Sequence, residues 1–144
     1  MVRYTVGIGV LALSLAAAAA SASNAQSTTA VLSIELNKLE QDGDECRFYL
    51  VIENGSDVAF AKFNTEMVFF DRRGVIVSRG TVDFAGLRPH KTHVMSFVFG
   101  PLDCTNVGRV LLNQVIECEH TAGTQLDCMD AIDVSHRGTV ELVK

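Results

Sequence analysis

Residues 45–74 read ECRFYLVIENGSDVAFAKFNTEMVFFDRRG, and apolar and polar side chains alternate through much of this stretch. Every second residue from 46 to 52 is apolar, which predicts a strand with one apolar face because successive side chains of a strand point to opposite sides. Asn54-Gly55 is a strong turn signal, and a second strand is expected at 58–70. Residues 71–74 then read as a type I turn that ends on glycine. The stretch predicts two consecutive strands joined by a turn.

The same period of two continues on both sides of this unit. It predicts further strands at 31–39, 75–84, 92–99, 107–118 and 134–143, with a bulge at Gly80 and a loop at 121–131. Short connections rich in Gly, Asn, Asp and Pro separate these strands, and no convincing amphipathic helix occurs. We therefore expect an all-β fold, an antiparallel sandwich of about seven strands in a single domain that spans residues 26–144.

The first 25 residues have the order of a secretory signal. Arg3 precedes an apolar run at 6–15, and small residues then lead to Ser23 and Ala25, the types that a signal peptidase accepts at positions −3 and −1. The strongly apolar part is shorter than the roughly 20 residues of a membrane-spanning helix. We predict cleavage after Ala25 and export by a Sec-type route. No cysteine lies near the predicted cut, so a lipoprotein is not expected.

The charge of the chain argues against nucleic acid as a partner. Twelve Lys and Arg stand against 17 Asp and Glu, a formal net charge of −5, and the basic residues form no stripe. A mildly acidic chain lacks the electrostatic footprint for nucleic acid or an anionic membrane surface. We expect neither of these partners and leave the oligomeric state open.

Four cysteines in an exported chain predict two disulfides, because the compartment is oxidising. Strands in up-and-down order place the start of the strand at 46 beside the start of the strand after 104. They also place the end of that later strand at 118 beside the loop that contains 128. We expect Cys46–Cys104 and Cys118–Cys128, which is one of three possible connectivities.

Several motifs resemble the small immunoglobulin-like domains of bacterial envelope proteins, of the FxLYD type. They are VIENGS at 51–56, MVFFDRRG at 67–74, LRPHKT at 87–92 and VMSF at 94–97. His90 stands where that group usually has glycine. The mature chain is also similar to uncharacterised small exported bacterial proteins that share the strand GRVLLN, here at 108–113. The resemblance implies an immunoglobulin-like sandwich outside the cytoplasm and supplies no active site.

A histidine and methionine cluster is the best metal candidate. His90, His93 and Met95 offer imidazole and thioether ligands that suit Cu(I), and they faintly resemble the His-x-Met element of periplasmic copper chaperones. The second His/Met pair of those proteins is missing. On a strand, His93 and Met95 share a face with core residues, so the expected set of cofactors is none, with copper binding as the alternative function.

Catalysis is not expected. The four cysteines are assigned to disulfides, and Ser135 and His136 are sequence neighbours that point to opposite faces of a strand. A small secreted hydrolase is kept as a second alternative. Asn54-Gly55-Ser56 also matches a glycosylation acceptor, although a tight turn explains it equally well.

The sequence therefore predicts a non-enzymatic periplasmic binding or accessory module. Such a module would present an edge strand or loops to another envelope protein. The expected partner surface consists of the two arginines of the 71–74 turn and of the connection between the fourth and fifth strands, namely Arg72, Arg73, Arg88 and His90.

Overall fold

The computed structural model describes residues 31–84, 86–121 and 128–144. The predicted signal peptide and most of the predicted 121–131 loop lie outside these residues. The described part contains eight strands and two short 3-10 helices, in the order β1 Leu32–Asp42, β2 Glu45–Asn54, β3 Phe60–Asp71, β4 Ile76–Asp83, β5 Lys91–Phe99, η1 Cys104–Asn106, β6 Val107–His120, η2 Met129–Ala131, β7 Ile132–His136 and β8 Glu141–Val143. The alternation of the sequence thus predicted the strand character of this part of the chain.

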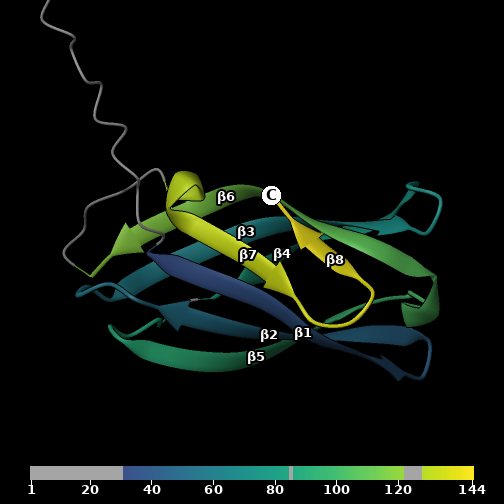
Figure 1. Cartoon of the computed structure of the whole chain (residues 1–144), viewed down its shortest axis with the longest axis horizontal. Helices are drawn as coiled ribbons and strands as arrows, with labels where there is room; N and C mark the ends of the chain where they lie inside the picture. Colours follow the sequence, from purple (N-terminus) through teal and green to yellow (C-terminus); the bar gives the residue numbers. More distant parts are fainter. Residues whose placement is uncertain (1–30, 85, 122–127) are drawn as a thin grey trace, which may run out of the picture.

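Two four-stranded sheets form a β-sandwich (Figure 1). One sheet has the order β5-β2-β1-β7 and the other has the order β4-β3-β6-β8. In both sheets the long central strands pair antiparallel, and β2 and β3 contribute apolar residues to the buried side at alternate positions. The alternation puts one face of each sheet into the shared core and the other face into water.

The C-terminal part departs from the expected antiparallel design. The single strand expected at 134–143 is two strands in different sheets, β7 beside β1 and β8 beside β6, and both of these pairs are parallel. Gly138, at φ 81°, lies between them in the left-handed region that glycine enters without steric cost. The chain can therefore cross from one sheet to the other, and Ile132 and Leu142 are both buried.

Phenylalanine rings fill the core at the ends of β2, β3 and β5. The ring centroids of Phe69 and Phe99 lie 4.4 Å apart, and Phe48 lies 4.7 Å from Phe69. A Cβ on Gly80 would come within 2.5 Å of the Phe99 ring, so the glycine makes room for this ring. The bulge expected at Gly80 is instead a register shift after Phe69, where β3 faces the start of β4.

Two disulfides join the strands to the connections beside them. Cys46 in β2 is bonded to Cys104 in η1, and Cys118 in β6 is bonded to Cys128. These are the two pairs that the strand order predicts. Two disulfides are typical of proteins in an oxidising, exported environment. Within the described residues, no helix has the length and apolar character needed to cross a membrane.

Candidate functional site

The four residues of the predicted partner surface lie at opposite ends of the sandwich. Arg72 and Arg73 follow the end of β3, whereas Arg88 and His90 lie near its beginning, where the Phe60 N–H donates to the carbonyl of Leu87. A 12-residue strand separates the two pairs, which corresponds to roughly 36 Å at the usual rise per residue. The structure does not bring the two pairs together, so the four residues form two separate surface regions at opposite ends of β3, and their use as a partner surface stays a prediction.

Both arginines at the first end stabilise the turn after β3. The buried carboxylate of Asp71 accepts the N–H groups of Arg73 and Val75 at 2.8 and 2.9 Å, and it pairs with the Arg73 guanidinium at 3.0 Å. The Val75 N–H, together with Arg73, holds the pKa of Asp71 below its ordinary value. Arg72 donates its Nε–H to the carbonyl of Thr105 at 2.9 Å. The contacts of these arginines are those of a structural turn.

A shallow hollow of about 370 Å³ lies beside this turn, lined by Arg72 and by residues of β1, η1 and the β7–β8 connection. Its cations are matched by acids: Lys38 pairs with Glu40 at 2.6 Å, and Arg137 pairs with Glu35 at 2.9 Å. Hydrogen bonds from Thr105 hold the pKa of Asp103 below its ordinary value, and the nearby positive charge of Arg72 adds to this effect. The hollow is therefore nearly balanced in charge, and it does not select an anion by its field.

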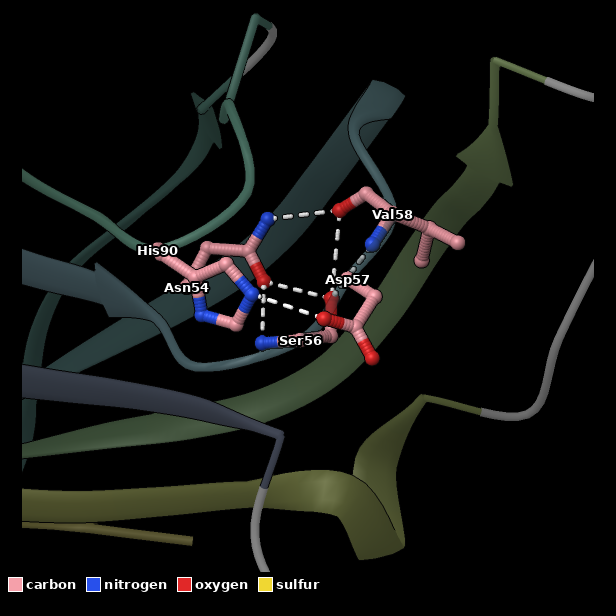
Figure 2. Close-up of polar contacts among 5 residues, drawn as sticks. All are labelled: Asn54, Ser56, Asp57, Val58 and His90. Atoms are coloured by element: carbon pink, nitrogen blue, oxygen red, sulfur yellow. Dashed lines mark hydrogen bonds and ion pairs between the residues drawn. The ribbon is translucent and has the colours of Figure 1, made fainter.

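The other end is organised by the buried side chain of Asn54 (Figure 2). Its Nδ2 donates to the carbonyl of Val58 at 2.8 Å and to that of Leu87 at 3.3 Å. Its Oδ1 accepts the N–H of Ser56 at 3.0 Å and the hydroxyl of Ser56 at 2.6 Å. Because the amide is fully bonded and 0 % exposed, the folded protein does not offer it as a glycosylation acceptor.

His90 lies on the outer side of this loop. Its Nε2 is 2.8 Å from Oδ1 of Asp57, which Figure 2 shows as a bridge from the β4–β5 connection to the β2–β3 loop. The φ angle of His90 is 51°, in the left-handed region. Histidine is one of the residues that tolerate this region, which explains how a residue other than glycine can occupy this position.

The three metal candidates are divided between the surface and the interior. His90 is exposed, whereas His93 and Met95 are opposite the buried Ile52 and Leu50 of β2 and therefore point into the sandwich. Nε2 of His93 is buried and has no hydrogen-bond partner in the structure. Within residues 31–84, 86–121 and 128–144, no three His, Cys, Asp or Glu side chains gather closely enough to hold a metal ion.

β5 is the long free edge of its sheet, at the lower rim of the view in Figure 1. It pairs with β2 over nine consecutive residues without a register shift, and no strand of the described residues pairs with its other side. On its outer face, Val94 is 70 % exposed and Val98 is 37 % exposed. The strand contains no proline and, after Lys91, no Lys, Arg, Asp or Glu.

The other three edge strands carry the features that natural proteins use to discourage pairing with another chain, which include charges, bulges and short length. β4 has the register shift after Phe69 together with Arg79 and Asp83, and β7 and β8 are only five and three residues long. β5 combines full length with regular register and has a single charged residue among Lys, Arg, Asp and Glu, Lys91 at its first position. The sequence signal for this difference is the uncharged stretch 92–99, in which valines occupy positions of the solvent face.

Comparisons with known proteins support the fold alone. No family model matches the sequence, and no match is found among curated proteins. Among solved structures, the chain is similar to IrmA from Escherichia coli, with a TM-score of 0.55 and 14 % sequence identity. The likeness covers 72 % of this chain and 89 % of IrmA. At this identity the similarity shows a shared arrangement of strands and carries no function across.

Proposed function

We propose that this protein is a non-enzymatic binding module of the periplasm that receives an extended segment of another envelope protein along β5. In this mode the segment adds a strand to the sheet, so its backbone pairs with the free N–H and C=O groups of the edge. The observation that carries the proposal is the unprotected edge of β5: nine residues in regular register, with exposed Val94 and Val98.

The physical argument rests on what an unpaired edge does. A long, regular and uncharged edge strand is a template for another strand, and for this reason natural edges are short, bulged or charged. β4, at the corresponding edge of the other sheet, follows this rule through Arg79 and its register shift. Retention of an unprotected β5 in the same molecule favours use of this edge for binding.

The location supports the same function. The disulfides suit an oxidising compartment, and the expected signal peptide would deliver the chain there.

The strand orders β1-β2-β5 and β4-β3-β6 favour a relationship to immunoglobulin-like domains, in which strands A, B and E lie together and C, F and their neighbours form the facing sheet. The parallel β6–β8 pair departs from that pattern.

The alternatives receive less support from the geometry. Copper carriage would need His90 to join His93 and Met95, but His90 is bound to Asp57 on the outside of the loop. A cysteine hydrolase would need a free thiol, and all four cysteines are in disulfides. Titration with Cu(I) and a panel of hydrolase substrates would test these two functions directly.

Crosslinking at the β5 edge tests the proposal. A photoreactive amino acid is placed at Ser96 on the outer face of β5, with Thr81 on the outer face of β4 as the matched control. We expect one envelope protein to be crosslinked from Ser96 and not from Thr81, and Val94→Lys to abolish this product while Thr81→Lys leaves it unchanged. The purified partner should then slow hydrogen exchange of alternate β5 amides. Equal crosslinking from both positions, recovery of the protein alone, or protection elsewhere would contradict the proposal.

A further inference from the structure

The inward side chains of β5 are covered on one side only. Met95, Phe97 and Phe99 pack against the core but stay partly exposed, whereas the residues opposite them in β2, such as Phe48 and Leu50, are at most 2 % exposed. The difference follows from strand order, because β2 has a neighbour on both sides and β5 has β2 alone. Partly exposed apolar surface therefore runs along the free side of β5 from Met95 to Phe99.

The facing edge strand, β4, carries small residues on its inner face. The inward positions of β4 that lie nearest its middle are Ser78 and Gly80, both small and partly exposed. The Phe99 ring covers Gly80, and the Phe97 ring packs edge-on against Phe84 at 5.6 Å. Phe97 and Phe99 therefore contact the opposite sheet through these rings, and both residues stay partly exposed in a strand that lies at the edge of its sheet.

We propose that the segment received by β5 carries bulky apolar residues at alternate positions, facing Met95, Phe97 and Phe99, with polar or small residues between them. The proposal rests on the function proposed above and specifies the chemistry of the partner. In an extended sheet, directly opposed side chains lie about 4.5–5.5 Å apart, so the inward residues of an added strand would cover the exposed sides of these three residues. Its other face would lie beside Val94 and Val98, next to water.

Two synthetic peptides of identical composition test this pattern. One carries alternating Thr and Ile in a seven-residue core between lysine pairs, and the other carries the same residues with the isoleucines contiguous. The protein is the mature chain with both disulfides formed. We expect the alternating peptide, with three isoleucines, to bind about threefold more tightly, because a contiguous run of three isoleucines places only two of them inward and one cross-strand apolar pair therefore distinguishes the two peptides.

N-methylation of the alternating peptide separates the two proposals. Methyl groups are placed either on the odd-numbered or on the even-numbered backbone nitrogens of the peptide. One set should abolish binding and the other should leave it unchanged, because only one set of N–H groups faces β5. Equal affinity of the alternating and the contiguous peptide, together with this dependence on the methylated set, would overturn the alternating pattern and keep edge pairing. Absence of binding, or loss with both methylated sets, would overturn both.

Substitution in β4 gives an independent measurement. Ser78→Leu places a bulky apolar side chain on the inner face of β4 and should abolish the preference for the alternating peptide, since the larger side chain would cover apolar surface that the inward residues of the peptide are proposed to reach. Thr81→Leu places the same side chain on the outer face of the strand and should keep the full preference. An unchanged preference in folded Ser78→Leu would contradict the proposed position of the apolar residues.

Discussion

Removal of the Asn54 side chain should destabilise the β2–β3 loop and the whole domain with it. The amide makes four hydrogen bonds at 2.6–3.3 Å from a fully buried position. The carbonyls of Val58 and Leu87 keep one further donor each, from Ser56 and Phe60, so they are not orphaned. At about 1 kcal/mol net per hydrogen bond, with the longest bond counted lightly, Asn54→Ala should lower the free energy of unfolding by about 2–3 kcal/mol.

Urea denaturation of the oxidised protein, followed by circular dichroism, measures this change, and the melting temperature should fall by roughly 10 °C. Asn37→Ala is the matched control, because Asn37 is exposed and bonds only to Glu35, so its loss should stay within about 0.5 kcal/mol. At neutral pH, Asn54→Asp should lower the free energy of unfolding more than Asn54→Ala does, since a carboxylate cannot donate to two carbonyls. Acidification should reduce this difference between the two variants. A loss below about 0.5 kcal/mol for Asn54→Ala would refute the reasoning.

Three further predictions concern the turns and the disulfides. Asp71→Asn should make the free energy of unfolding less dependent on pH in the acid range. In the wild type, the Val75 N–H holds the pKa of folded Asp71 below the ordinary 3.8. The carboxylate therefore stabilises the fold above that value, and this stabilisation is lost as the pH falls through the lowered pKa. Urea midpoints from pH 2 to 7 measure this, and an unchanged profile would contradict it. Gly108→Ala should cost about 1–3 kcal/mol, since its Cβ would lie 2.9 Å from the Arg72 backbone, while Gly55→Ala, in ordinary contact at 3.6 Å, should be nearly neutral by thermal melting. Loss of the disulfide that spans 58 residues should cost about 4 kcal/mol and loss of the one that spans ten about 2.5, and a reversed order in urea titrations would exclude the chain-entropy account.

The sequence predicts the strands and the disulfides because both depend on local patterns. The alternation from Cys46 to Ile52 predicts which face of the strand is buried. Because consecutive strands run in opposite directions, the two cysteines of each pair then lie at the same end of the sandwich. The split of the last strand was not predictable in this way. Residues 134–143 alternate well enough for one strand, and only the competition of two sheets for Ile132 and Leu142 decides that the chain turns at Gly138.

The candidate site escaped sequence reasoning for a related reason. Arg72 and Arg73 are charged, so the sequence presents them as available for a partner. In the fold, Arg73 pairs with the Asp71 carboxylate and Arg72 donates to the carbonyl of Thr105, a residue distant in sequence. Whether a strand has one neighbour or two is a property of the sheet as a whole. The exposure of Val94 therefore indicates a binding surface only together with the position of β5 at the edge of its sheet, which the sequence does not reveal.

The crossing of β7 and β8 also constrains the timing of folding. β7 completes the sheet of β1, and β8 completes the sheet of β6. Lys144 then bonds back to the carbonyl of Ile132. Each sheet thus gains one edge strand from residues that follow all its other strands in the sequence, so neither sheet is complete before β7 has been synthesised, and the second is not complete before β8. Late completion of both sheets would favour the export that we propose, since passage through a narrow translocation channel requires an unfolded chain.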